Sequence, residues 1–353
     1  MQMEQKIRWL GMTLPEMETA MQQMGEKPFR ARQLCSWIYG KGASDFAEMT
    51  DFSLSFREKL AEVSEIGLSV VEEYHQSTQD PVKKALMTLW DHEMIESVLM
   101  KYNYGNSVCV STQAGCKMNC RFCATGLNGF RRNLSAGEML GQVLVMRDLD
   151  GGDRISHLAL MGMGEPLDNF DQVLRFLQIA NANWGLGIGY RHITVSTCGI
   201  TPQIERLMQE DLPINLSISL HAPNDTIRQH LMPIAKHYPL DELLAACKLY
   251  SDTTKRRITF EYNLIDSIND KPEHARELVQ KMRNMLCHVN LIPLNTVPES
   301  NLYRSKPDNT QAFADLLKQM GIEVTLRREM GSDIFAACGQ LRGQHQIRKG
   351  TRK

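Results

Sequence analysis

The chain has 353 residues, of which 42% are apolar and 23% are charged, and this composition excludes a disordered protein. It contains no stretch of about 18 apolar residues, and its first residues mix both charge signs, so we expect a cytoplasmic protein without a membrane span or secretory signal. The net charge of −1 excludes a global electrostatic attraction to nucleic acid and leaves only local basic patches for that purpose.

The first sixty residues have a helical pattern. Pro28 begins a segment in which apolar residues recur at helical spacing, and a second short helix is predicted after Ser53. From about residue 66 to 101 the pattern changes to strand-like runs separated by turn candidates at 80–81 and 91–92. This segment predicts a small antiparallel meander that joins two domains.

From about residue 105 onward, strand patterns and helix patterns alternate. The predicted strands are SVCVST, ISHLALM, HITVST, INLSISL, ITFEYNLI, HVNLIPL and IEVTLR. The predicted helices are Ser135–Leu149, which begins with a capping box, Val173–Ala180, Ile204–Gln209, Leu240–Leu249, His274–Met285 and Thr310–Gln319. Such alternation indicates right-handed βαβ units and a parallel sheet. A closed or partial barrel is favoured over an open sheet, because no dinucleotide-binding fingerprint follows the first strand.

Polar residues stand where several of these strands end. In a barrel the carboxyl ends of the strands meet at one rim, and active sites are built there. Each residue taken singly also fits an ordinary strand-to-loop transition, but their coincidence favours a site. The residues are Ser196, Thr197, Ser219, His221, Asn263 and Asn295.

Three cysteines, Cys116, Cys120 and Cys123, follow a C-x3-C-x2-C spacing. Their thiolates can converge on one metal centre from a single loop. Three thiolates around a cubane cluster leave one iron without a protein ligand. The alternative is a zinc site, which needs a fourth ligand; His92 or His157 is available, but neither lies at a familiar zinc spacing. We therefore favour an iron–sulfur cluster with an open iron.

The loop GCKMNCRFCATG resembles the signature of radical S-adenosylmethionine enzymes. This resemblance implies a [4Fe-4S] cluster, S-adenosylmethionine bound to its fourth iron, and a partial (β/α)6 barrel around them. Further motifs resemble the RlmN family, the dual-specificity rRNA and tRNA methyltransferases that make 2-methyladenosine. They are MGMGEPLDN, STCG, SLHAPND, EYNLI, HVNLIPLN and DIFAACGQL.

The RlmN resemblance implies roles for individual residues. Cys338 matches the cysteine that becomes S-methylated, Cys109 the resolving cysteine, and Glu96 the proposed proton acceptor. The positions that match contacts to S-adenosylmethionine are Gly164, Glu165, Ser196, Ser219, Leu220, His221 and Asn295. From the residues alone, Cys109 and Cys338 would be buried apolar thiols and Glu96 an exposed carboxylate. We assign only that apolar role to Cys35, Cys198, Cys247 and Cys287.

The resemblance also implies the substrates: adenosine 2503 of 23S rRNA and adenosine 37 of tRNA. A flavodoxin or ferredoxin system is expected as electron donor. Two alternatives stay open. One is the related enzyme that methylates C8 of the same ribosomal adenosine with the same five cysteines. The other is a non-catalytic iron–sulfur or zinc-stabilised RNA-binding protein, which would not cleave S-adenosylmethionine.

Basic residues gather in three places despite the neutral total. They mark the N-terminal helical region, the segment after the cluster loop, and the C-terminal tail: Lys27, Arg30, Arg32 and Lys41; Arg131 and Arg132; Arg342, Arg348, Lys349, Arg352 and Lys353. Each patch is as well explained by ordinary solvated charge. We expect an RNA-binding helical domain over 1–62, a β-rich linker over 63–103, a barrel with the catalytic cysteine segment over 104–341, and a basic tail over 342–353.

Overall fold

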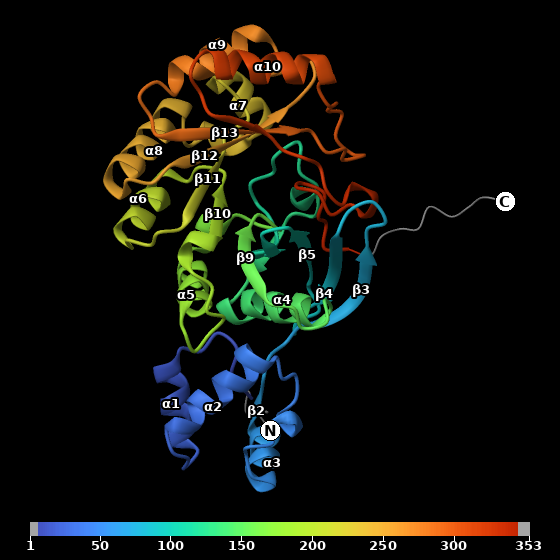
Figure 1. Cartoon of the computed structure of the whole chain (residues 1–353), viewed down its shortest axis with the longest axis vertical. Helices are drawn as coiled ribbons and strands as arrows, with labels where there is room; N and C mark the ends of the chain where they lie inside the picture. Colours follow the sequence, from blue (N-terminus) through green and yellow to red (C-terminus); the bar gives the residue numbers. More distant parts are fainter. Residues whose placement is uncertain (1–5, 345–353) are drawn as a thin grey trace, which may run out of the picture.

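The computed structural model describes residues 6–344 of the chain. Figure 1 shows a small helical unit from the N-terminal region at one end of the molecule and a larger α/β unit above it. In the larger unit the helices lie outside a curved sheet. No helix in the described part of the chain combines the length and apolarity that crossing a bilayer needs.

The main sheet has ten strands in the order β14-β13-β12-β11-β10-β9-β6-β5-β4-β3. Every pair from β6 to β14 is parallel, as the strand–helix alternation predicts. The partial barrel is therefore confirmed. The strands of this parallel part are β6 (Gly105–Cys109), β9 (Ile155–Leu160), β10 (Ile193–Thr197), β11 (Asn215–Ser219), β12 (Ile258–Leu264), β13 (Cys287–Pro293) and β14 (Val324–Leu326).

The predicted meander consists of three antiparallel strands, β3 (Val70–Gln76), β4 (Val82–Thr88) and β5 (Met94–Tyr102). It differs from the expected linker in one respect, because β5 also pairs with β6. Backbone groups along β6 would otherwise be left unpaired, and β5 satisfies them through an antiparallel turn. The three strands therefore extend the barrel sheet.

Helices cover the outer face of the parallel strands. α4 (Ala136–Asp148) begins with the predicted capping box, in which the Ser135 hydroxyl accepts from the Glu138 N–H at 3.2 Å. The others are α5 (Phe170–Asn181), α6 (Thr201–Gln209), α7 (Asp225–Leu231), α8 (Leu240–Thr254), α9 (Pro272–Lys281) and α10 (Pro307–Gln319). The sequence analysis missed α7, which is short and mostly polar and begins at the Asn224 side-chain cap.

Side chains alternate along β11 and β12 between an apolar outer face and a polar inner face. On β11, Leu216 and Ile218 are buried under the helices, whereas Asn215 and Ser217 face a cavity inside the barrel. β12 repeats the pattern, with Thr259 and Glu261 facing inward. The interior of this barrel is therefore lined for a polar ligand.

The N-terminal unit contains α1 (Leu14–Gln23), α2 (Phe29–Cys35) and α3 (Leu54–Val63), and a wider π-helical segment, Ser36–Lys41, continues α2. The short strands β1 (Ile7–Arg8) and β2 (Ser64–Glu65) pair in parallel and close the unit. It packs closely on the barrel: a Cβ on Gly11 would lie 2.5 Å from the Gly137 nitrogen. Glycine at both positions allows the two backbones to touch.

Candidate active site

A cleft of about 910 Å³ lies at the carboxyl ends of the parallel strands, within the size range of small-molecule sites. All three cysteines of the predicted cluster loop line it. The remaining predicted residues that line it are Gly164, Glu165, Ser196, Thr197, Ser219, His221, Asn263 and Cys338. The expected gathering of strand-end residues at one rim is therefore found in the structure.

The cluster loop is held at both ends. It follows β7 (Gln113–Gly115), which pairs with β8 (Phe130–Asn133), so the loop leaves and returns to one hairpin. Gly115 has a φ of +73°, and a Cβ there would lie 1.9 Å from the Gly129 oxygen. The Ala124 N–H donates to the Gly339 carbonyl at 2.7 Å, which ties the loop to the segment that carries Cys338.

The three loop thiols suit a soft metal centre. Cys116, Cys120 and Cys123 open onto one cleft, and burial raises the pKa of Cys116 to about 12. Within residues 6–344, no three His, Cys, Asp or Glu side chains already stand at metal-binding geometry. Thiolates are the ligands of iron–sulfur clusters, and a bound metal keeps a coordinating thiol deprotonated. The donor set therefore fits a cluster held by three cysteines.

Glu165 joins two loops at the base of the cleft. Its carboxylate accepts from the Leu167 N–H at 3.0 Å and from the Cys198 N–H at 2.7 Å. Burial raises the pKa of Glu165, and the hydrogen bonds from Thr197, Cys198 and Leu167 oppose that shift. The carboxylate thus fixes the loop after β9 against the loop after β10 beside the cysteines.

His221 also faces the cleft. Its Nδ1 accepts from the Asn263 N–H at 2.9 Å, and its ring meets Phe122 of the cluster loop edge-on at 4.6 Å. Burial lowers the pKa of His221 to about 3, so the ring is neutral at physiological pH. A neutral ring with Nδ1 occupied presents an Nε2 donor.

Two predicted cofactor contacts do not line this cleft. Leu220 is fully buried, and its N–H donates to the Glu261 carbonyl at 3.1 Å. Asn295 lines a neighbouring cavity, where its amide donates to the Cys338 carbonyl at 2.9 Å. In this structure Asn295 positions the cysteine segment.

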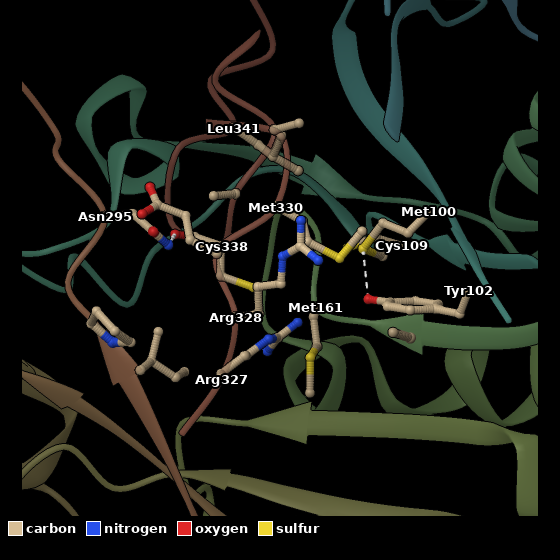
Figure 2. Close-up of a pocket in the computed structure, with 16 residues that line it drawn as sticks. Met100, Tyr102, Cys109, Met161, Asn295, Arg327, Arg328, Met330, Cys338 and Leu341 are labelled. Carbon is tan, nitrogen blue, oxygen red and sulfur yellow. Dashed lines mark hydrogen bonds between the residues drawn. The ribbon is translucent and has the colours of Figure 1, made fainter. Parts of the chain in front are cut away.

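The neighbouring cavity brings Cys109 and Cys338 together (Figure 2). Cys109 ends β6, whereas Cys338 follows the short helical turn Ser332–Ile334 near the C-terminus. Both thiols are free, and burial raises the pKa of Cys109 to about 12. Cys338 also lines the first cleft, so it stands between the two cavities.

Glu96 is buried, which contradicts the exposed strand position expected from the residues alone. It forms an ion pair with Lys84 and accepts from the N–H groups of Arg342 and Gly343. It lines neither cavity. However, Val98 on β5 pairs with Cys109 on β6, and Glu96 lies two residues before Val98. Glu96 and Cys109 are therefore on the same face of the sheet.

The basic patches differ in how much charge they leave available. Arg132 is paired with Asp91 and Glu138, and Arg342 is paired with Glu299. These ion pairs neutralise two of the positive charges that the sequence offered for RNA binding. The tail positions Arg348, Lys349, Arg352 and Lys353 lie outside the described residues.

The N-terminal patch carries aromatic partners. Lys27, Arg32 and Lys41 are exposed, and the Lys41 ammonium lies 3.3 Å from the centre of the Trp37 ring. Arg30 lies over Phe29, 49% of which is exposed. Cations beside partly exposed aromatic rings are typical of nucleic-acid contacts.

Comparison with known proteins covers nearly the whole chain. Residues 7–66 match the ribosomal RNA large subunit methyltransferase N-terminal domain, and residues 110–279 match the radical SAM superfamily. A probable dual-specificity RNA methyltransferase RlmN from Thermoanaerobacter sp. (strain X514) is 51% identical over 334 residues, which cover 95% of this chain and 97% of that protein. The corresponding protein of Desulforamulus reducens is 48% identical over 341 residues, 97% of each chain.

The chain belongs to the RlmN family. A solved structure agrees: the crystal structure of a radical SAM methyltransferase from Sphaerobacter thermophilus has a TM-score of 0.93 and 40% identity, and the match covers 96% of this chain and all of that one. The chain is thus a radical SAM RNA methyltransferase of the RlmN type.

The sequence analysis missed one residue at the centre of this RlmN site. Arg327 follows β14 and lines both the cysteine cleft and the cavity of Cys109 and Cys338 (Figure 2). The negative charge of Cys338 contributes most to a raised Arg327 pKa. Arg327 stands at a strand end, the same signal that pointed to Ser196 and Ser219.

Arg228 and Cys198 were missed as well. Arg228 on α7 is fully buried, its guanidinium donates to the Cys198 carbonyl at 2.6 Å, and burial lowers its pKa. Cys198 itself lines the cleft with the cluster cysteines. No local sequence pattern predicts a buried arginine on a short polar helix, because an arginine in such a helix is expected to be solvent-exposed.

Proposed function

We propose that this enzyme methylates C2 of adenosine 2503 in 23S rRNA and of adenosine 37 in tRNA. Cys116, Cys120 and Cys123 hold a [4Fe-4S] cluster, and the cleft beside them binds S-adenosylmethionine. A flavodoxin or ferredoxin system of the cytoplasm supplies the electron. One observation carries the proposal: Cys338 lines both the cysteine cleft and the cavity that contains Cys109. A cysteine in that position can receive a methyl group on one side and deliver it on the other.

The cofactor end of the cleft is formed by polar groups of the chain. Glu165, Ser196, Ser219 and His221 surround the space beside the loop thiols, and Gly164 lets the backbone come close to a ligand. When bound, the cluster supplies one-electron reductive cleavage of S-adenosylmethionine, which yields a radical able to remove hydrogen from a methyl group.

Cys338 acts first as a nucleophile. Its thiolate takes the methyl group of one S-adenosylmethionine by displacement, and S-adenosylhomocysteine leaves. After a hydrogen atom is lost from that methyl group, its carbon bonds to C2 of the adenine and links Cys338 to the RNA. An electrophilic aromatic carbon can be reached in this way, whereas direct transfer from the electrophilic donor cannot reach it.

Release of the product needs a base and a second thiol. Glu96 takes the C2 proton, a role supported by its place on the strand face that carries Cys109. Cys109 then attacks the Cys338 sulfur; the sulfur–carbon bond breaks, a disulfide forms, and the released carbon takes up a proton to become the methyl group of the departing base, while the unpaired electron left by the radical addition would return to the cluster. External reduction of the disulfide returns both thiols.

The RNA must present an unstacked adenosine, as for other base-modifying enzymes. We assign RNA backbone contact to the N-terminal unit over 1–62, supported by exposed Lys27, Arg32 and Lys41. Replacing these three by glutamate should weaken RNA affinity and its salt dependence. Unchanged affinity would remove this part of the proposal.

The deciding experiment is nucleoside mass spectrometry after anaerobic reaction of reconstituted enzyme with S-adenosylmethionine, reductant and 23S rRNA or tRNA. 2-Methyladenosine is expected with wild type and is lost in Cys338→Ala. Cys109→Ala should retain a covalent protein–RNA adduct, because the thiol that resolves it is missing. Formation of 8-methyladenosine alone would assign the C8 activity, and absence of S-adenosylmethionine cleavage would overturn the enzyme mechanism.

A further inference from the structure

A third cavity opens at the opposite, amino-terminal end of the barrel strands. Its walls come from the strand beginnings, among them Asn215 on β11 and Thr259 on β12. It shares Met161, Arg327 and Tyr102 with the cavity of Cys109 and Cys338, so the two cavities are adjacent and these side chains form the boundary between them. A route from this end of the barrel to Cys338 would pass these side chains and would not cross the cysteine cleft.

The lining of this cavity is polar. Closed β/α barrels fill the interior with layers of bulky branched side chains. Here Ala159, Met161 and the Glu261 carboxylate also line the cavity, but many inward positions carry hydroxyl or amide groups: Ser107, Thr194, Asn215, Ser217, Thr259 and Asn290. Such groups do not pack into a dry core, and they suit a ligand with many hydrogen-bonding atoms.

The rim of the cavity combines aromatic rings with cations. Tyr102 and Tyr104 stack with ring centres 4.8 Å apart and 7° between their planes, and 66% of Tyr104 is exposed. Lys255 and Arg256 stand across the cavity before β12. Arg256 is oriented by its bond to the Ile214 carbonyl at 2.8 Å, whereas Lys255 makes no hydrogen bond or ion pair with any described residue.

Stacking rings beside phosphate-binding cations are the means by which proteins hold single-stranded nucleic acid. Under the proposed function Cys338 meets two different reactants, and it lines two different cavities. We propose that the target RNA strand enters through the amino-terminal end of the barrel: Tyr104 stacks on a base beside the target, Lys255 and Arg256 face its phosphates, and the target adenine passes Arg327 to reach Cys338. This inference rests on the proposed function and adds the route of the substrate.

The test measures the affinity of full-length reconstituted enzyme for a fluorescein-labelled RNA hairpin carrying the target adenosine. Tyr104→Ala should weaken binding by about 5- to 150-fold, the cost of one lost base–aromatic stack. Tyr104→Phe keeps the ring and should bind within about twofold of wild type. Tyr303→Ala is the matched control, because Tyr303 is equally exposed, at 72%, but lies in the segment after β13 and lines none of the three cavities.

A second measurement places the RNA directly. p-Benzoylphenylalanine introduced for Tyr104 should cross-link to nucleotides next to the target adenosine, and the same group introduced for Tyr303 should not. Wild-type affinity in Tyr104→Ala, equal losses in Tyr104→Ala and Tyr303→Ala, or cross-linking only from position 303 would each overturn the route. Binding is measured without turnover, so these outcomes are independent of which methylated nucleoside the enzyme makes.

Discussion

The ammonium of Lys84 lies 2.8 Å from the carboxylate of Glu96, and both side chains are almost completely buried, at 2% and 3% exposure. The other carboxylate oxygen accepts from the Gly343 N–H at 3.0 Å. The strands β4 and β5 thus carry a buried ion pair, and the segment after Cys338 is hydrogen-bonded to it through Gly343. The residue assigned as proton acceptor is therefore also a structural anchor for the segment after Cys338.

Replacing Lys84 by methionine should lower the free energy of unfolding by about 3–5 kcal/mol, because Glu96 is left as an unpaired buried charge. The double variant Lys84→Met with Glu96→Leu should recover part of that loss, since both charges are removed. Urea unfolding at neutral pH measures both. A single variant as stable as wild type would show that the pair is not formed in solution.

Arg327 should accelerate reactions of the Cys338 thiolate. The guanidinium lies in the cavity with Cys109 and Cys338, and a nearby permanent cation stabilises a negatively charged sulfur. In Arg327→Gln, iodoacetamide should modify Cys338 about tenfold more slowly at pH 7.5, because the cation beside the sulfur is lost. In Arg327→Lys, which keeps the positive charge, the rate of Cys338 modification should fall less.

Peptide-resolved mass spectrometry of the apoprotein follows each cysteine separately. Cys109, whose pKa burial raises to about 12, is the internal comparison and should react slowly in all variants. Equal Cys338 rates in wild type and Arg327→Gln would argue against electrostatic activation.

His221 should make the protein acid-sensitive. Burial lowers its pKa to about 3 in the folded state, whereas the unfolded chain binds the proton below about pH 6.5. The unfolded state therefore holds more protons between these values, and stability falls as pH decreases from 6.5 toward 3. Between pH 6.5 and 4.5, this single histidine should lower the free energy of unfolding by about 2–3 kcal/mol.

His221→Asn keeps an acceptor for the Asn263 N–H and removes the titration, so its unfolding free energy should change less between pH 6.5 and 4.5. Urea unfolding of the two apoproteins at both pH values measures the difference. If wild type and variant lose the same amount, His221 is not the group responsible.

Gly164→Ala should destabilise the fold by about 2 kcal/mol or more. Gly164 has a φ of +101°, and a Cβ there would lie 2.5 Å from the Gln113 Cβ. Gly40→Ala is the control, because its nearest neighbour would be the Ser36 hydroxyl at 3.9 Å and its φ is not positive. In thermal unfolding, Gly164→Ala should have a lower melting temperature than Gly40→Ala, and similar melting temperatures would contradict the predicted clash.

The sequence by itself determined the features that depend on neighbouring residues. The spacing of Cys116, Cys120 and Cys123 limits them to one loop, and the Ser135–Glu138 capping box begins α4 as predicted. The alternation of strand and helix patterns predicted the parallel barrel. Each of these follows from backbone sterics, side-chain periodicity or loop length, which act over a few residues.

Family resemblance added what residue patterns could not. It assigned catalytic roles to Cys109, Cys338 and Glu96, which from the residues alone would be two buried apolar thiols and an exposed carboxylate. The structure places the two cysteines in one cavity, and their individual roles stay predictions until the variants are measured.

Only the tertiary structure decided which distant residues meet. Gly343 donates to Glu96 from 247 residues away, β5 joins the barrel through β6, and Arg327 reaches the cavity of both cysteines. Such contacts depend on the packing of the whole chain, because burial and charge pairing are optimised over all elements together and leave no mark at any one position. For that reason the cluster loop and the order of strands and helices could be predicted from local patterns, whereas these long-range contacts could not.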